Sequence, residues 1–258
     1  MQRFFYCITL LCILFSQKFD FSRYDHLLKQ VVNTEGLVNY TALQSKYKPE
    51  LAKLVQQFAH VSPDNNPELF KTEPEQLAYW INAYNLSILK LIAHEYPVKS
   101  IKDIYAVLGI AGELVWTKSI HTLGGKDYSF NEIEHDIIRK RFNEPRIHFA
   151  INCASMGCPL MQNYAFLPDK LDGQFNEAMS DFFKSDRHFK IDNHNKTLYL
   201  TKIFEWFSED FYNEDNGETI YKFLIANAPD RSLAKKLNSI KAGYRIEYLD
   251  YSWDLNSQ

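Results

Sequence analysis

The chain has 258 residues, of which 46% are hydrophobic, so it is long enough to bury a substantial core within one domain. Its formal net charge is −3, and its Lys and Arg residues are dispersed among acidic ones, which excludes the basic surface that nucleic-acid binding requires. Aromatic residues make up 15% of the chain, and we attribute them mainly to core packing rather than to a carbohydrate or peptide groove.

An apolar run from Phe4 to Phe15 follows Arg3 at the beginning of the chain. The run is too short to cross a bilayer but has the length of the hydrophobic region of a signal peptide. We expect residues 1–16 to be removed near Ser16, which leaves no membrane span in the mature chain; an uncleaved anchor is the alternative. The mature protein is then exported through the secretory pathway to the periplasm or the extracellular space.

The first half of the chain shows helical spacing of apolar residues over residues 21–32 and 43–58. Thr72 and Glu75 then form a capping box around Pro74, which predicts a longer helix that continues to about Ile92. Asn82 and Asn85 lie in the middle of this helix, where asparagine is disfavoured. We expect Asn85 either to hold a neighbouring loop or to orient a substrate or a catalytic group.

Strand-like residues between 116 and 128 flank a Gly-Gly turn and predict a hairpin. Ser129 and Glu132 form a second capping box, and the helix that follows carries His135 and Arg139 four residues apart on one face. The later part of the chain predicts a helix over 171–182, strands over 188–191 and 197–203, short helices between 204 and 237, and a final strand over 244–256. These elements predict one α+β domain over residues 21–256, with several helices packed around a small, mainly antiparallel sheet.

The stretch from Pro145 to Pro159 holds the two cysteines of the expected mature chain. Polar and apolar residues alternate from Arg146 to Asn152, a pattern that predicts a strand with one apolar face. Because Gly157 permits a left-handed backbone, we expect a tight turn that presents both thiols. Along a straight strand, His148 and Cys153 point to opposite faces.

Four chemistries are open for this stretch. In an exported protein, Cys153 and Cys158 can form a disulfide. Alternatively, either thiol is the nucleophile of an amide or acyl-transfer reaction, with His135 or His148 as the base. A zinc site from the two histidines and the thiols is the third hypothesis, although no other cofactor is predicted. The fourth is a non-catalytic pocket in which Arg139, Arg146 and His148 hold an anion.

The chain resembles the family of proteins with domain of unknown function 547 (DUF547). The resemblance rests on five blocks that occur in the family's order, and their sequences are WINAYN (80–85), EIEHDIIR (132–139), EPRIHFAINCASMGCP (144–159), TKIFEWF (201–207) and SWDLN (252–256). Two small departures, CPL after the second cysteine and YSWDLN at the end, leave Cys158 and Trp253 in place. The resemblance extends over residues 24–256 and implies no established activity.

The matched blocks contain the residues that we expect to form the site. The expected catalytic residues are Cys153, Cys158, His135 and His148. The expected substrate-binding residues are Asn82, Tyr84, Asn85, Glu134, Arg139, Arg146, Asn152 and Ser155. We therefore predict a thiol-dependent hydrolase or acyltransferase that acts on a small-molecule or peptide-like substrate; the alternatives are a binding domain with a Cys153–Cys158 disulfide and a zinc module.

Overall fold

The computed structural model describes residues 18–105, 112–213 and 219–258, and the predicted signal peptide lies outside these ranges. Helix accounts for about 51% of the structure and strand for about 10%, arranged as a single α+β domain. The predicted fold class is therefore confirmed.

Helical segments alternate with short strands along the described chain. The first half contains α1 Ser22–Val31, α2 Tyr40–Gln44, α3 Lys48–His60, the 3₁₀ turns η1 Pro67–Leu69 and η2 Ile101–Asp103, α4 Glu73–Glu95, α5 Glu113–Thr117, β1 His121–Leu123, β2 Lys126–Tyr128, the π-helix η3 Glu132–Ile138 and α6 Arg139–Arg141. The second half contains the 3₁₀ helix η4 Pro145–Phe149, α7 Leu171–Lys184, β3 Phe189–Asp192, β4 Thr197–Leu200, α8 Ile203–Trp206, α9 Ser208–Phe211, α10 Ile220–Ala226, α11 Arg231–Ile240 and β5 Arg245–Tyr248.

Helix α4 is the central element of the larger core. It begins at the predicted capping box, in which the Thr72 side chain accepts from the backbone N–H of Glu75 and the Glu75 side chain accepts from the N–H of Thr72. Beyond its first turn the helix is buried on all sides, as expected for a helix that is apolar around its whole circumference. Its two asparagines are therefore buried as well, which obliges their amides to find partners inside the protein.

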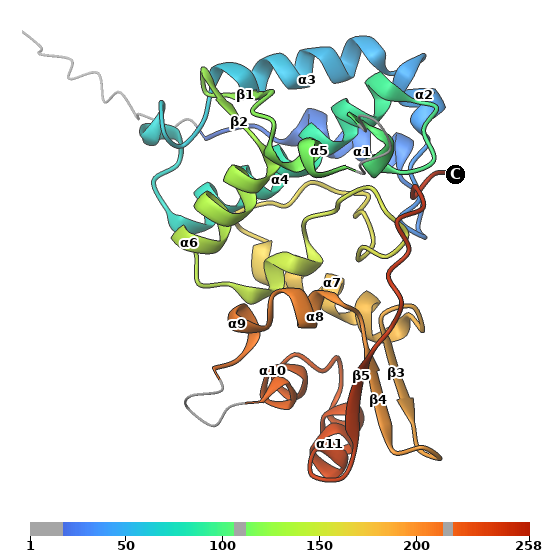
Figure 1. Cartoon of the computed structure of the whole chain (residues 1–258). Helices are drawn as coiled ribbons and strands as arrows, with labels where there is room; N and C mark the ends of the chain where they lie inside the picture. Colours follow the sequence, from blue (N-terminus) through green and yellow to red (C-terminus); the bar gives the residue numbers. More distant parts are fainter. Residues whose placement is uncertain (1–17, 106–111, 214–218) are drawn as a thin grey trace, which may run out of the picture.

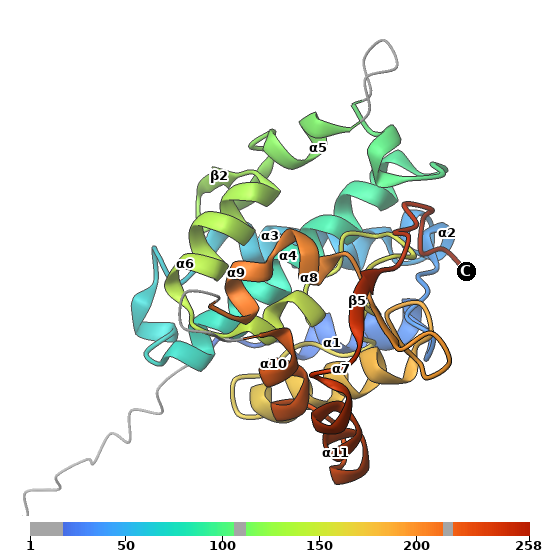
Figure 2. The same ribbon diagram turned by 60° about the horizontal axis from the view of Figure 1, so that its bottom comes forward.

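Two apolar clusters fill the domain. One surrounds α4 and includes side chains of α1, α2, α3 and η3, and the other joins α7 to the three-stranded sheet, α10 and α11. Figure 1 shows the first group at the top and the second at the bottom, and α11 projects away from the helical part in both views (Figures 1 and 2). The 3₁₀ helix η4 contributes to both clusters, because Ile147 belongs to the first and Phe149 to the second.

The strands form two small sheets. Strands β1 and β2 make an antiparallel hairpin with His121 opposite Tyr128, which confirms the predicted hairpin. In the second sheet, β3 pairs antiparallel with β4, whereas β4 and β5 run parallel with Thr197 opposite Arg245. Two of the three strand pairs are thus antiparallel, in agreement with the prediction.

The strand predicted over 146–152 is wrong, because residues 145–149 form the 3₁₀ helix η4. Pro145 fixes a helical φ angle at its start, and the side chain of Glu144 accepts from the backbone N–H of Arg146 at 3.1 Å. The four residues from Ile147 to Ala150 are all buried, so the alternation of residue types did not reflect one solvated face. Because there is no strand here, the prediction that His148 and Cys153 point to opposite faces no longer holds.

Two further predictions need correction. The helix predicted over 43–58 is divided into α2 and α3, and Pro49 occupies the first turn of α3, where proline favours a helix start. Of the final strand predicted over 244–256, only the four residues of β5 form a strand.

After β5 the C-terminal segment, residues 249–258, runs back to the first helices (Figure 1). Its backbone N–H groups at Leu255 and Asn256 donate to the carbonyls of Lys99 and Ala154 at 2.8 and 3.1 Å. The segment thereby lies against the cysteine loop and joins the two apolar clusters.

Candidate functional site

The cysteine loop, residues 152–159, is shaped by its contacts with the C-terminal segment. The backbone N–H groups of Met156 and Gly157 each donate at 2.8 Å, to the carbonyls of Asp254 and Ser252. A Cβ atom on Gly157 would lie 2.8 Å from the Ser252 carbonyl oxygen, so this position requires glycine because of close approach. The left-handed residue is Ala154, with φ 61°, and not Gly157 as predicted.

Cys153 and Cys158 are joined by a disulfide bond. The Tyr251 hydroxyl lies 3.1 Å from each sulfur, and the backbone N–H of Cys153 donates to the sulfur of Cys158 at 3.0 Å. The Ser155 hydroxyl lies 3.2 Å from the sulfur of Cys153. In this state neither cysteine carries a free thiol, so the structure agrees with the disulfide alternative, and a thiol nucleophile requires prior reduction.

A cavity of about 170 Å³ opens beside the disulfide, and we call it the aromatic pocket. Its aromatic lining residues come from α4, α5, α8, the residue after α8 and the C-terminal segment, and they are Tyr84, Trp116, Trp206, Phe207, Tyr251 and Trp253. Its other lining residues include the two cysteines, Asn131, Glu134, His135 and His148. The structure thus brings six of the predicted site residues to one cavity, namely Tyr84, Glu134, His135, His148, Cys153 and Cys158.

Three aromatic rings form one wall of the pocket. The ring centroids of Trp206 and Tyr251 lie 4.8 Å apart, as do those of Tyr251 and Trp253. Trp206 stacks on Trp253 with centroids 6.1 Å apart, yet 46% of its surface remains exposed. A tryptophan held in place by its neighbours and open to solvent provides apolar surface to an incoming molecule.

Glu134 provides a carboxylate to the lining of the pocket. It lies on the π-helix η3, whose residues Ile133, Ile137 and Ile138 are buried, and it is itself half-buried at the edge of the cavity. The Tyr84 hydroxyl donates to the carboxylate at 3.2 Å. Burial and then the charge of Glu134 raise the pKa of Tyr84, so the phenol stays neutral and acts as a donor.

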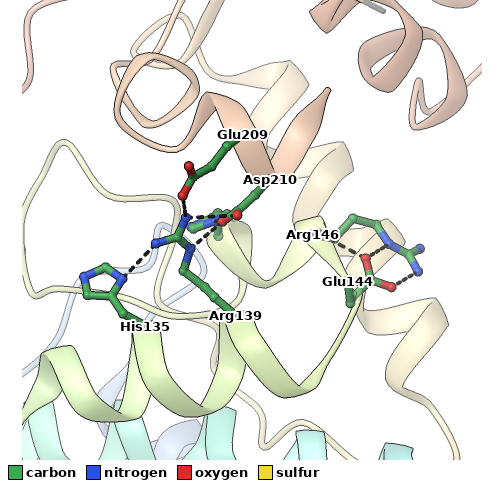
Figure 3. Close-up of polar contacts among 7 residues, drawn as sticks. His135, Arg139, Glu144, Arg146, Glu209 and Asp210 are labelled. Carbon is green, nitrogen blue, oxygen red and sulfur yellow. Dashed lines mark hydrogen bonds and ion pairs between the residues drawn. The ribbon is translucent and has the colours of Figure 1, made fainter. Parts of the chain in front are cut away.

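Behind the pocket, Asp210 joins Arg139 to His148. Its carboxylate accepts from Nε of Arg139 at 2.5 Å (Figure 3). The same carboxylate lies 2.6 Å from Nε2 of the buried His148. Burial raises the pKa of Asp210, but hydrogen bonds from His148 and Arg139 outweigh it and lower the pKa to about 2. Because an ionised carboxylate only accepts, His148 carries a proton on Nε2, and its ring is fixed further by stacking on Phe207 at 4.3 Å.

His135 is held in a different way. One terminal nitrogen of Arg139 lies 3.0 Å from Nδ1 of His135, and Figure 3 shows the guanidinium between this ring and the carboxylates of Glu209 and Asp210. A guanidinium can only donate, so Nδ1 of His135 accepts and is not free to act as a base. Of the two histidines proposed as bases, His148 therefore has the arrangement typical of an oriented imidazole.

The predicted asparagines tie down loops and do not line the pocket. Asn85 donates to the carbonyl of Ala150 and accepts from the N–H of Asn152, both at 2.9 Å. Asn82 makes the same pair of bonds with the backbone of Phe166, and Asn152 donates to the carbonyl of Pro159 at 2.7 Å. Asn85 thus performs the loop-holding role that we considered for it.

Arg146 also lies outside the aromatic pocket. It pairs with Glu144 and Asp172 at 2.6 and 2.9 Å, apart from Arg139 (Figure 3), and it borders a separate groove. The two arginines and His148 therefore do not meet as an anion-binding group. Ser155 touches the disulfide from outside the cavity lining.

Sequence reasoning did not identify Trp116, Trp206, Tyr251, Trp253 or Asp210 as site residues. Trp206 and Trp253 lie in the two late blocks, TKIFEWF and SWDLN, so the blocks themselves contained the signal. Asp210 follows no recognisable pattern, since its partners are more than 60 residues away in the chain.

The described residues contain no group of three His, Cys, Asp or Glu side chains placed to hold a metal ion. Across the same residues, none of the helices combines the length and the apolar character that a membrane crossing requires.

No curated protein and no solved structure gives a significant match. A family described as "Protein of unknown function, DUF547" matches residues 68–183, a range that includes the first three of the five blocks. The match supports the assignment of the chain to the DUF547 family, and the matched range supplies the helix α4, the π-helix and the cysteine loop of the pocket.

Proposed function

We propose that the protein is a binding domain that takes a small molecule into the aromatic pocket, with the Cys153–Cys158 disulfide as part of the wall. The observation that carries this proposal is the convergence on one cavity of three of the four tryptophans of the chain, a carboxylate and two histidines. These residues come from segments as far apart as α4 and the C-terminal segment, and core packing alone would not leave Trp206 half exposed.

Tryptophan fluorescence tests the proposal. Three of the four tryptophans line the pocket, whereas Trp80 is buried in the core and does not line it, so a change in emission reports mainly on the pocket. A library of small polar and aromatic molecules should contain members that change the emission in a saturable way. Trp206→Ala should weaken their binding about tenfold, because it removes an aromatic wall.

Leu114→Ala is the matched control, since Leu114 is 50% exposed and does not line the pocket. If a ligand binds the Trp206 variant as tightly as the wild type, its site lies outside the aromatic pocket. A library in which no molecule gives saturable binding would contradict the proposal.

We also propose that the protein is exported, to the periplasm or the extracellular space. The disulfide supports this, because such bonds persist in oxidising compartments. Mass spectrometry of the protein recovered from cell fractions should find it outside the cytoplasm with residues 1–16 removed.

A second candidate is the thiol-dependent hydrolase or acyltransferase, active once the disulfide is reduced. It is favoured by the donors around the sulfur of Cys158, namely the N–H of Cys153 and the hydroxyl of Tyr251, which would stabilise a thiolate. His148, oriented by Asp210, lines the same pocket. The thiolate would attack an acyl carbon and expel the amine or alcohol, and water or a second acceptor would then cleave the thioester.

An activated ester tests this candidate. With a reductant that is itself removed before the assay, the wild type should release one equivalent of leaving group in a burst, and Cys158→Ser and His148→Gln should not. His26→Gln, which changes an exposed histidine, should leave the burst intact. No burst from the reduced wild type would remove the candidate and leave the binding proposal standing.

A further inference from the structure

Among the described residues, the lining of the aromatic pocket contains an acidic side chain but no Lys or Arg side chain. Glu134 is the one Asp, Glu, Lys or Arg residue among the described side chains that line the cavity. Arg139 lies behind His135, and its guanidinium is already paired with Asp210 and Glu209 at 2.5 and 2.6 Å. The pocket therefore presents a carboxylate without a compensating cation in its lining.

The aromatic wall adds an attraction for positive charge. The face of an indole or phenol ring carries negative partial charge, and it attracts cations that lie within about 6 Å of the ring centroid. Trp253 already shows this property, because the ammonium group of Lys102 lies 3.6 Å from its ring centroid. Lys102 itself is not among the residues that line the cavity.

From these observations we infer that the pocket binds a small organic cation, such as a substituted ammonium group, between Glu134 and the rings of Tyr84, Trp206, Tyr251 and Trp253. The cation would be held by the carboxylate on one side and by the ring faces on the other. The inference rests on the proposed binding function and names its ligand class.

The size and the lining of the cavity agree with this class. A volume of about 170 Å³ exceeds the cavity of about 150 Å³ that holds one benzene molecule, so a compact head group fits. A mainly aromatic and apolar lining with one carboxylate favours a cation with methyl or methylene groups over a strongly hydrated metal ion. Anions are disfavoured, because Glu134 repels them and the nearby guanidinium of Arg139 is already paired with two carboxylates.

A pair of isosteric probes tests the inference on the wild-type protein. Choline carries a trimethylammonium group, and 3,3-dimethylbutan-1-ol is its neutral carbon analogue of the same shape. Titration followed by tryptophan fluorescence and by calorimetry should show choline binding at least about tenfold tighter than the alcohol, with an affinity that falls as salt is added.

Glu134→Gln then separates charge from shape. It should weaken choline binding about tenfold and leave the affinity for the alcohol unchanged, since the amide keeps the volume of the carboxylate. Glu68→Gln, which removes an exposed carboxylate that does not line the cavity, should leave both affinities unchanged. Circular dichroism and the melting temperature would check that the variants are folded.

The outcomes distinguish this inference from the proposed function. Equal or tighter binding of the alcohol, or choline binding that Glu134→Gln does not weaken, would overturn the cation class and leave a pocket for neutral ligands. If neither probe binds while other library members give Trp206-dependent saturation, the class is wrong and the binding function stands. If no molecule of any class binds, both proposals fall.

Discussion

Single residues differ widely in what they contribute to this site, and Asp210 and Glu209 show the contrast. Both carboxylates bond to Arg139, but the side chain of Glu209 is 78% exposed and that of Asp210 is 22% exposed. Only Asp210 also contacts His148, whose side chain is almost fully buried. A half-buried carboxylate that satisfies two donors contributes to stability, whereas an exposed ion pair contributes little.

We predict that Asp210→Asn lowers the free energy of unfolding by about 2 kcal/mol at pH 7, because the charge of an acceptor of three hydrogen bonds is lost. Glu209→Gln, the matched control on the neighbouring residue, should cost less than about 0.5 kcal/mol. Urea denaturation of the three proteins measures the difference. Equal effects of the two substitutions would mean that Asp210 has no special role.

The same residue gives a dependence on pH. Hydrogen bonds lower the pKa of folded Asp210 to about 2 against partial burial, while the unfolded chain keeps the ordinary value of 3.8. Between these values the unfolded state binds more protons, so the contribution is present above pH 4 and is lost as the pH falls towards 2. The stability difference between wild type and Asp210→Asn should therefore shrink over this interval.

At the scale of elements, the sequence predicted those whose signals are local. Helix α4 was predicted because the capping box, the proline in the first turn and the apolar spacing all indicate the same element. The 3₁₀ helix η4 was mistaken for a strand, because its alternation of residue types arises from burial on both sides, which depends on segments distant in the chain. The disulfide was weighed correctly as an alternative, since two cysteines five residues apart can close such a loop.

The pocket itself was predictable only in part, for the same reason. His135 and His148 were found from residue type, but local patterns did not decide between them. Arg139 decides the matter by donating to His135, and Asp210, more than 60 residues away, orients His148. The aromatic wall was missed because aromatic residues occur throughout the chain, and local patterns do not separate those that line a cavity from those in the core.

We predict that Thr72→Ala lowers the free energy of unfolding by about 1 kcal/mol, because it removes the side-chain acceptor of the α4 capping box. Ser232→Ala, in the exposed first turn of α11, should change it by less than about 0.5 kcal/mol, as the side chain there lies in solvent. Chemical denaturation with unchanged m-values would show that stability alone has changed.

For the molecule as a whole, two buried histidines outside the pocket make the free energy of unfolding depend on pH in mildly acidic solution. Burial, and then the charge of Lys90, lowers the pKa of His121 to about 3. Burial, and then the charge of Arg187, lowers the pKa of His188 to about 4. Both side chains are nearly inaccessible and belong to different apolar regions, so each must be neutral while its region stays folded.

The folded state therefore binds fewer protons than the unfolded state from the ordinary histidine value of 6.5 down to about 4. Stability should fall with decreasing pH in this interval, by about 1.4 kcal/mol per pH unit for each histidine that the unfolded chain protonates. His188→Gln should reduce this slope by about half, whereas His26→Gln should not change it, because His26 is exposed to solvent. Urea titrations at several pH values measure the slopes, and a flat profile for the wild type would contradict the prediction.

During synthesis, the C-terminal segment leaves the ribosome after the elements that it contacts. Tyr251 and Trp253 complete the wall of the aromatic pocket, and Asn256 accepts from the hydroxyl of Tyr40 at 2.7 Å and donates to Asn152 at 3.3 Å. A nascent chain from which residues 249–258 have not yet emerged lacks these contacts, even when all the other elements have been made. The pocket thus cannot form before residues 249–258 have left the ribosome, and a shorter nascent chain lacks Tyr251 and Trp253 in the pocket wall.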